Sequence, residues 1–302
     1  MGKVVDGYLA LRRATGYQMR VQEYLLRSFV NFAAERGETH VRVPSAIEWA
    51  RLAPSEGQRA NRLGVLRAFA RFARAEDPGH EVPPNRVFAT SGDRHVPFIF
   101  SAEQVRELVK RARQMPPAGS LRPWTYATLF SLLAATGLRI SEALNLRLDD
   151  VTTDGLVIRE TKFRKSRLVP LHPTADAGLA RYLDRRRSIG LDDYVFVSLR
   201  GTTLRYPGVV TTFLRLVRGM GIHPGPGCRG PRIHDLRHSF AVRVLEGCLT
   251  SRHAVDAQML ALSTYMGHGK LDSTYWYLHA TPRLLKGVAE ATEDFTQGAE
   301  PR

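Results

Sequence analysis

A stretch without helical or strand periodicity, EDPGHEVPPNRVFATSGDRHVPFIF (76–100), divides this chain into two parts. It contains four prolines and two glycines. Prolines remove backbone hydrogen-bond donors and glycines favour turns, so such a stretch interrupts regular structure. Each part of the 302-residue chain is long enough to bury its own core. We therefore predict a helical domain over residues 1–80, a linker over 81–97, and a second domain over 98–302 that ends in a C-terminal tail.

The first part carries two amphipathic helical patterns. The segment 24–37 repeats apolar residues at helical spacing and ends at Gly37, which can cap a helix. The segment 59–77 combines an apolar stripe with an arginine-lined surface. The stripe residues are Leu63, Leu66, Phe69, Ala70 and Ala73, and the arginines are Arg59, Arg62, Arg67, Arg71 and Arg74. An arginine-lined face is either an ordinary solvated surface or a contact for a DNA backbone.

The second part mixes helical patterns with one hairpin pattern. Ser101 followed by Gln104 predicts a capping box at the start of a helix. The segment 125–137 is apolar almost all round, which predicts a buried central helix. In 155–171, two β-rich runs flank a polar, basic middle, which predicts a β-hairpin.

The remaining segments complete a mostly helical second part. We expect a helix in LRISEALNLRLDDV with Ser141 as its cap, and a short strand in YVFV. Further helices are expected at 174–190, 208–219 and 234–247. The predicted fold class is mainly α with a small β-sheet, formed by a helical N-terminal domain and an α+β second domain.

The charge and cysteine content limit the class of protein. A net charge of +15 predicts a polyanionic partner, and most of the 44 basic residues are arginines, whose planar fork suits phosphate. A basic bias of the source proteome would give the same composition. The two cysteines, Cys228 and Cys248, provide neither a disulfide framework nor a Cys-rich zinc site, which predicts a cytoplasmic protein. We find no membrane-spanning run and no secretory signal.

Two motifs offer cations. Arg139 follows the buried helical segment and a glycine turn, where a charged residue must find water, a partner or an anionic ligand. Pairing with Glu142 at i,i+3 spacing is the structural alternative. Lys162 and Lys165 lie in the middle of the predicted hairpin, where a lysine either reaches into a DNA groove or stays in solvent.

Two further motifs offer histidines and tyrosines. In HDLRH, His234 and Arg237 share one face of a predicted helix, and His234 and His238 have a spacing that also suits two metal ligands. That metal alternative needs a third ligand, and no HExxH pattern is present. In MGHGKLDSTYWYLHATP, a histidine lies between glycines, upstream of Tyr275 and Tyr277. An aromatic patch that anchors a C-terminal helix is the alternative for the tyrosines.

Taken in order, these motifs resemble the catalytic domain of the tyrosine recombinases, the phage-integrase and Xer-type family. ATGLRISEALNL resembles the family's first box and gives Arg139. HDLRHSFA resembles the second box and gives His234 and Arg237. MGHGKLDSTYWYLHAT resembles the last box, giving His268 and, nine residues later, Tyr277.

The hairpin departs from the family pattern. Alignment of TKFRKSRLVPL from its VPL ending puts the active lysine on Lys162 rather than Lys165, but the usual glycines at the hairpin tip are missing. The resemblance covers about residues 98–290. Residues 1–80 fit the family's SAM-like core-binding domain in length and class, and the wording around the last box is similar to a transposon-borne branch.

The resemblance implies DNA cleavage and rejoining without a metal or other cofactor. Tyr277 would attack the scissile phosphate and form a 3′-phosphotyrosine link, while Arg139 and Arg237 would clamp the phosphate oxygens. Lys162 would protonate the departing 5′ oxygen. His234 would assist proton transfer, and His268 would hydrogen-bond the phosphate.

Helix geometry favours one of the two tyrosines. Residues two apart on a helix point in nearly opposite directions, so only one of Tyr275 and Tyr277 could face the phosphate. The family spacing favours Tyr277. In an extended segment both tyrosines would share a face.

The implied partners are double-stranded DNA and other copies of this chain in a DNA-bound multimer, with an accessory recombinase or directionality factor as a further possibility. The location expected is the cytoplasm, at the nucleoid. Three alternatives stay open: a type IB topoisomerase-like relaxing enzyme, a non-catalytic DNA-binding regulator with the same fold, and a metal nuclease that uses His234 and His238.

Overall fold

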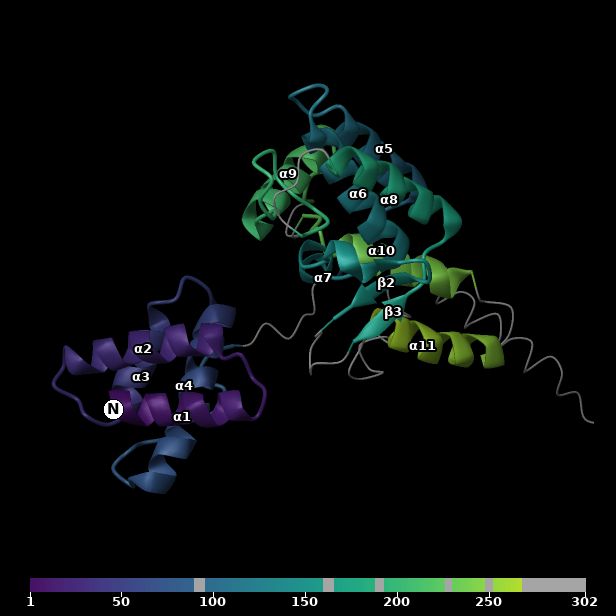
Figure 1. The fold of residues 1–302 in the computed structure, drawn as a ribbon. Coiled ribbons are helices and arrows are strands. Elements are labelled where there is room, and N and C mark those ends of the chain that lie inside the picture. The colour runs from purple at the N-terminus through teal and green to yellow at the C-terminus, as the bar shows by residue number, and fades with distance from the viewer. Residues whose placement is uncertain (90–95, 160–165, 188–192, 226–229, 248–251, 268–302) are drawn as a thin grey trace, which may run out of the picture. The chain divides into compact units, whose positions relative to one another are not determined.

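The chain divides into two compact units, Met1–Arg94 and His95–Arg302, each with its own hydrophobic core. The computed structural model describes residues 1–89, 96–159, 166–187, 193–225, 230–247 and 252–267 (Figure 1). None of the helices within these ranges combines the length and the apolarity needed to cross a bilayer.

In its described residues, the N-terminal unit is a bundle of helices around one core. These helices are α1 (Gly2–Ala14), α2 (Arg20–Ala34), α3 (Val43–Arg51) and α4 (Glu56–Glu76) (Figure 1). Helix α4 packs against each of the other three. The left-handed backbone of Gly37, with φ of 70°, closes the turn after α2, as its sequence position predicted.

The two predicted apolar stripes line this core. Leu25, Leu26, Phe29 and Ala33 of α2 are buried, as is the whole predicted stripe of α4. Trp49 of α3 packs edge-on against Phe29, with ring centroids 5.4 Å apart, and its Nε1 donates to Ser28 Oγ. Truncating a buried aromatic of this kind to alanine costs about 3–5 kcal/mol, so these rings hold α2 and α3 together.

The C-terminal unit is built around helix α6 (Leu121–Thr136), most of whose residues are buried. Helices α5 (Ala102–Arg113), α8 (Pro173–Arg186) and α10 (Asp235–Glu246) pack against it. The predicted capping box starts α5: the Gln104 N–H donates to Ser101 Oγ, and the Ser101 N–H donates to Gln104 Oε1. The capping box is confirmed, and so is the predicted central helix, because most residues of α6 are buried.

A three-stranded antiparallel sheet follows α7 (Ile140–Leu144) and the short 3₁₀ helix η1 (Leu148–Asp150). Its strands are β1 (Val151–Thr152), β2 (Gly155–Ile158) and β3 (Arg167–Val169), in the order β1-β2-β3. In the β2–β3 pair, Leu156 lies opposite Val169 and Ile158 opposite Arg167. The predicted hairpin and the predicted fold class, mainly α with a small sheet, are confirmed.

Two local predictions in this unit are wrong. Ser141 does not cap α7. The cap is Arg139, whose backbone N–H donates to Glu142 Oε2, because a carboxylate three positions on reaches the first free N–H groups of the helix. Tyr194 and Val197 do not form a strand together. Each makes an isolated bridge, Tyr194 with Arg147 and Val197 with Thr203.

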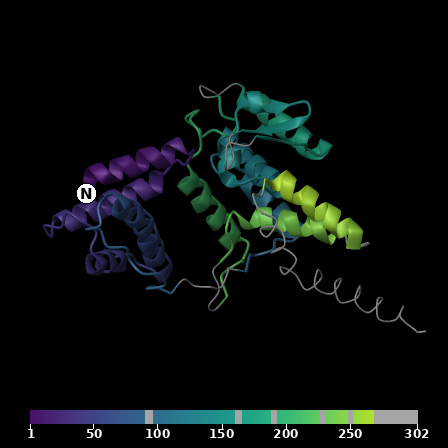
Figure 2. The same ribbon diagram turned by 90° about the horizontal axis from the view of Figure 1, so that it is seen from below.

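The last described helices complete the unit. They are α9 (Tyr206–Gly219) and α11 (Arg252–Met266), of which the sequence patterns predicted only the first. Helices α10 and α11 lie next to each other in the view of Figure 2 and share a small core that contains Leu245, Leu262 and Met266. Helix α11 also contacts β3, so its C-terminal end lies close to the hairpin.

Candidate active site

A glycine turn between α6 and α7 positions Arg139. Helix α6 ends at Gly137, whose φ of 61° is left-handed, and a Cβ there would lie 2.4 Å from the Phe240 ring. Only glycine fits this turn, and two residues later Arg139 opens α7. Arg139 Nη1 donates to Glu142 Oε1 at 2.7 Å, so the pairing considered as a structural alternative exists.

The ion pair with Glu142 engages only part of the hydrogen-bonding capacity of the Arg139 guanidinium. Its Nη2 donates to the carbonyl of Gly267 at 3.0 Å, and the side chain keeps 29% of its surface exposed. A guanidinium has five N–H donors, so the ion pair and the carbonyl leave donors for a further acceptor. The structural alternative and an anion-binding role are therefore compatible.

Arg237 is among the largest fully buried side chains of the described residues, at 2% exposure. From α10, its Nη1 donates to the carbonyl of Gly137 at 2.5 Å and its Nη2 to the carbonyl of Met266 at 2.8 Å. Burying a cation is costly unless it is hydrogen-bonded, and these carbonyls stabilise the charge. Arg237 thereby joins the end of α6 to the end of α11.

His234 lies directly before α10, with its ring edge-to-face against His238 at a centroid distance of 4.7 Å. Desolvation by surrounding protein atoms, followed by the charges of Arg237 and Arg232, lowers the pKa of His234 to about 4. The residue as a whole is nevertheless exposed. A neutral imidazole offers one ring nitrogen as a hydrogen-bond donor and the other as an acceptor.

The three predicted residues that the structure describes come together. Arg139 and Arg237 bind neighbouring carbonyls at the end of α11, and both of their charges act on His234. Two guanidinium groups beside a neutral imidazole form a site suited to a tetrahedral anion such as a phosphodiester.

The other predicted site residues lie outside the described residues. These are Lys162, its alternative Lys165, His268, Tyr277 and its alternative Tyr275. In the sequence, His268 directly follows Gly267, whose carbonyl binds Arg139.

Sequence patterns missed Arg167 and Gly267, which also belong to this site. Arg167 on β3 ion-pairs with Glu142, and its side chain contacts the end of α11. A signal was present: Arg167 shares the inward face of a strand with Val169, and an inward arginine predicts a buried partner. Gly267 has a left-handed φ of 66°, which the GHG sequence permits but does not require.

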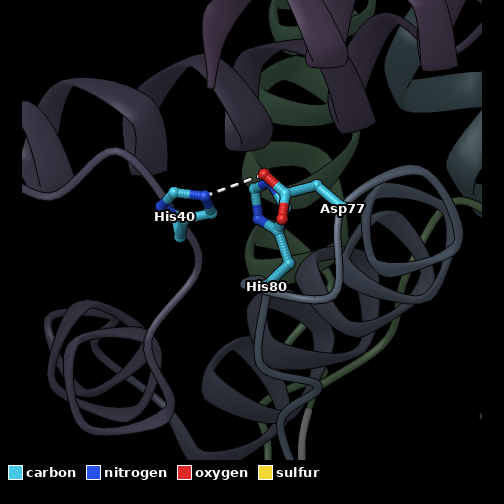
Figure 3. A group of neighbouring side chains, drawn as sticks. All are labelled: His40, Asp77 and His80. Carbon is cyan, nitrogen blue, oxygen red and sulfur yellow. Dashed lines mark hydrogen bonds and ion pairs between the residues drawn. The ribbon is translucent and has the colours of Figure 1, made fainter.

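One group of potential metal ligands occurs in the described residues, and it lies in the N-terminal unit. His40 precedes α3, and Asp77 and His80 follow α4, with ligand atoms within 4.8 Å of one another (Figure 3). His40 Nε2 lies 2.9 Å from Asp77 Oδ2. The Val41 N–H donates to Nδ1 of His80, so a neutral His80 carries its proton on Nε2.

That hydrogen bond argues against a ready-made metal site. A histidine that binds a metal normally donates from its other ring nitrogen, whereas here that nitrogen accepts. Metal binding by His80 would cost the Val41 hydrogen bond. The donor set fits a hydrogen-bonded link between the segment before α3 and the end of α4.

Comparisons with known proteins agree with the motifs. The model of the phage integrase family matches residues 99–283. The integrase/recombinase y4rB of Sinorhizobium fredii is 38% identical over 303 residues, covering 96% of each chain. Tyrosine recombinase XerD of Lacticaseibacillus casei is 28% identical over 235 residues, covering 76% of this chain and 74% of the relative.

Solved structures share the fold. The Tn1549 transposon integrase in complex with transposon right end DNA aligns with a TM-score of 0.70 at 17% identity, covering 97% of this chain and 98% of that chain. The XerH recombinase bound to its difH substrate aligns with a TM-score of 0.65 at 18% identity, covering 87% and 76%. With the family match over residues 99–283 and a relative similar over nearly its whole length, this chain belongs to the phage integrase family, the tyrosine recombinases.

Proposed function

We propose that this chain is a site-specific DNA recombinase that cuts and rejoins strands through a 3′-phosphotyrosine intermediate. The observation that carries the proposal is the meeting of Arg139 and Arg237 at the end of α11, with the charges of both acting on His234, in a member of this family. Their chemistry is what phosphoryl transfer to a hydroxyl nucleophile requires: fixed positive charge and a group for proton transfer.

In the proposed reaction, the Tyr277 hydroxyl attacks phosphorus. The bond from phosphorus to the 5′ oxygen breaks as the bond to the tyrosine oxygen forms, and the 5′ oxygen takes a proton from Lys162. Arg139 and Arg237 stabilise charge on the non-bridging oxygens, and His268 hydrogen-bonds one of them. His234, neutral because of its lowered pKa, takes the proton that the Tyr277 hydroxyl loses and passes it to water.

The intermediate suits recombination. A phosphotyrosine link conserves the energy of the phosphodiester bond, so a 5′ hydroxyl from another strand can displace the tyrosine without a nucleotide cofactor. The reverse step uses the same groups, with Lys162 accepting the proton that it donated before.

The N-terminal unit is proposed to bind DNA as a core-binding domain over residues 1–80, joined through a linker at 81–97 to the catalytic domain. Its helix α4 carries Arg67, Arg71 and Arg74 at helical spacing, and no carboxylate partner occurs for them among the described residues. Such a row of cations suits phosphate groups of a DNA backbone.

We further propose that the enzyme acts as a multimer on double-stranded DNA at the nucleoid. Support comes from the structural relatives, which include a lambda integrase dimer bound to a core site and a lambda integrase tetramer bound to a Holliday junction. An accessory recombinase or directionality factor would act on the same complex.

The test is covalent trapping on nicked suicide DNA taken from beside the gene. We expect a protein–DNA adduct that forms in EDTA, with mass spectrometry locating the link on a tyrosine. Relaxation of supercoils without joining of two sites would favour the topoisomerase-like alternative. Tight DNA binding without an adduct would favour a non-catalytic regulator, and cleavage that EDTA abolishes would favour a metal nuclease.

A further inference from the structure

Arg167 holds the β-hairpin to two other parts of the candidate site. Its side chain is 13% exposed and lies at the start of β3. Nη1 donates to Glu142 Oε1 at 3.0 Å and Nη2 to Glu142 Oε2 at 2.8 Å, a two-pronged ion pair. Nε donates to the carbonyl of Tyr265 at 2.8 Å. One guanidinium therefore links β3 to α7 and to the end of α11.

Glu142 also binds Arg139 and so connects Arg139 to Arg167. Its carboxylate is 7% exposed and also accepts from the Arg139 backbone N–H at 2.9 Å and from Arg139 Nη1 at 2.7 Å. Burial alone would raise the pKa of Glu142, but the hydrogen bonds from Arg167 and Arg139 outweigh it and lower the pKa to about 2. Glu142 is thus an anion held from two sides, and each arginine limits where the other can lie.

Three arginines donate to consecutive carbonyls at the end of α11, the last of which belongs to Gly267, directly after the helix. Arg167 binds the carbonyl of Tyr265, Arg237 that of Met266, and Arg139 that of Gly267. The last carbonyls of a helix lack partners within the helix and carry partial negative charge, so cations stabilise this end. Each arginine comes from a different element: β3, α10 and the start of α7.

The backbone at Gly267 is shaped around Arg167. A Cβ on Gly267 would lie 2.9 Å from Arg167 Nη1 and 3.2 Å from Cζ, and its φ of 66° already disfavours other residues. The absence of a side chain allows the guanidinium to lie against the backbone that leads into residue 268.

We propose that Arg167 is a positioning residue of this site, which aims Arg139 through Glu142 and fixes the end of α11. This inference rests on the proposed function for its kinetic consequence, but its geometric part stands apart from it. Arg167 touches no reacting atom in the proposed reaction. It acts by holding Arg139 and the carbonyl of Gly267 in one arrangement.

The test compares Arg167→Met, which keeps an unbranched apolar side chain, with Arg167→Lys, which keeps the charge but loses the fork. We expect the single-turnover rate of adduct formation at saturating DNA to fall about 10²-fold in Arg167→Met, because small misplacements of catalytic groups cost that much. The affinity for DNA should change little. Arg167→Lys should recover only part of the rate, because a point charge cannot bind both carboxylate oxygens.

A matched control separates positioning from general loss of an ion pair. Arg106→Met removes an exposed arginine that pairs with Glu103 on α5, and the rate should stay at the wild-type value. A purely structural role of Arg167 would lower the melting temperature and the fraction of folded protein, with an unchanged rate per folded molecule. That result would overturn the proposal.

Crystal structures of Arg167→Met and the wild type test, without any activity measurement, whether Arg167 positions Arg139 and the end of α11. The proposal expects the Arg139 guanidinium and the carbonyl of Gly267 to shift apart in the variant. If both stay in place, Arg167 does not position them, and the inference is wrong. If the wild type forms no adduct on any DNA, the proposed function fails, while this structural comparison still decides the role of Arg167.

Discussion

Helix α4 of the N-terminal unit and the end of α11 in the C-terminal unit use arginine in different ways. On α4, Arg71 and Arg74 extend into solvent, whereas Arg62 donates to the carbonyl of Trp49 and lies over its ring. At the end of α11, Arg237 is buried, and its guanidinium binds backbone carbonyls. The first region presents charge to whatever approaches, and the second fixes charge in place.

This difference teaches what composition alone cannot. A net charge of +15 is compatible with solubility, a biased proteome or a polyanionic partner. Exposed arginines contribute long-range attraction that salt screens, whereas buried and hydrogen-bonded arginines can stabilise charge in a transition state. The two regions should therefore respond differently to substitution, with the largest effects at the end of α11 and the smallest on α4.

Replacement of Arg237 by alanine should have the largest effect. It removes a cation proposed to clamp the phosphate and leaves the carbonyls of Gly137 and Met266 without their donors. We expect the cleavage rate to fall by about 10²–10³-fold or more, and the free energy of unfolding to fall by about 1–3 kcal/mol. Single-turnover trapping and urea unfolding measure the two effects. A variant with wild-type cleavage would remove Arg237 from the proposed mechanism.

Replacement of Gly267 by alanine should come next. The new Cβ meets Arg167 and sits on a left-handed backbone, so we expect both stability and cleavage to decrease. Gly221→Ala is the matched control, because Gly221 has a φ of 77° but open space around it. Strain of this kind costs about 1–3 kcal/mol. Equal losses of stability in the two variants would mean that the contact with Arg167 contributes nothing.

The titration of His234 is a third test of the charge fixed at the end of α11. Its folded-state pKa of about 4 lies below its ordinary value of 6.5, so folding favours the neutral ring. The stabilisation is complete above the unfolded pKa and is lost as the pH falls from 6.5 towards 4. NMR titration of the His234 ring should give a midpoint near 4. A midpoint near 6.5 would contradict the electrostatic picture.

The exposed arginines of α4 should give the smallest effects. In Arg71→Ala and Arg74→Ala, DNA affinity should fall, and the slope of log affinity against log salt should fall by about 1 for each phosphate group that is no longer neutralised. Stability should stay within about 0.5 kcal/mol of wild type. The control Arg62→Ala should lose stability instead, because Arg62 holds α3 to α4. Unchanged DNA binding in the first two variants would make α4 an ordinary solvated surface.

Much of the fold could be predicted from local patterns. Patterns among neighbouring residues predict the stripes of α2 and α4, the capping box of α5, the apolar α6 and the hairpin. Two predictions were wrong: Ser141 as the cap of α7, and a strand at 194–197, where the structure has two isolated bridges. Several local hydrogen bonds are possible at these positions, and tertiary packing determines which of them forms.

The candidate site was predictable in part. Arg139, His234 and Arg237 follow from motif spacing, and the structure brings them together. Arg139 and Arg237 bind carbonyls at the end of α11, which carry no signal in the sequence because every residue has a carbonyl. Arg167 was missed because its partner Glu142 lies 25 residues away, across the hairpin. The catalytic roles of all six residues stay predictions, and Lys162, His268 and Tyr277 lie outside the described residues.

The most direct test of the central claim is covalent trapping with Tyr277→Phe and Tyr275→Phe beside the wild type. All three proteins would be incubated with the same nicked suicide DNA, and adducts counted after denaturing electrophoresis. We predict an adduct with wild type and Tyr275→Phe, and none with Tyr277→Phe. An adduct that survives in Tyr277→Phe and disappears in Tyr275→Phe would contradict the assignment of the nucleophile. Adducts in both variants would contradict the proposed tyrosine mechanism at this position altogether.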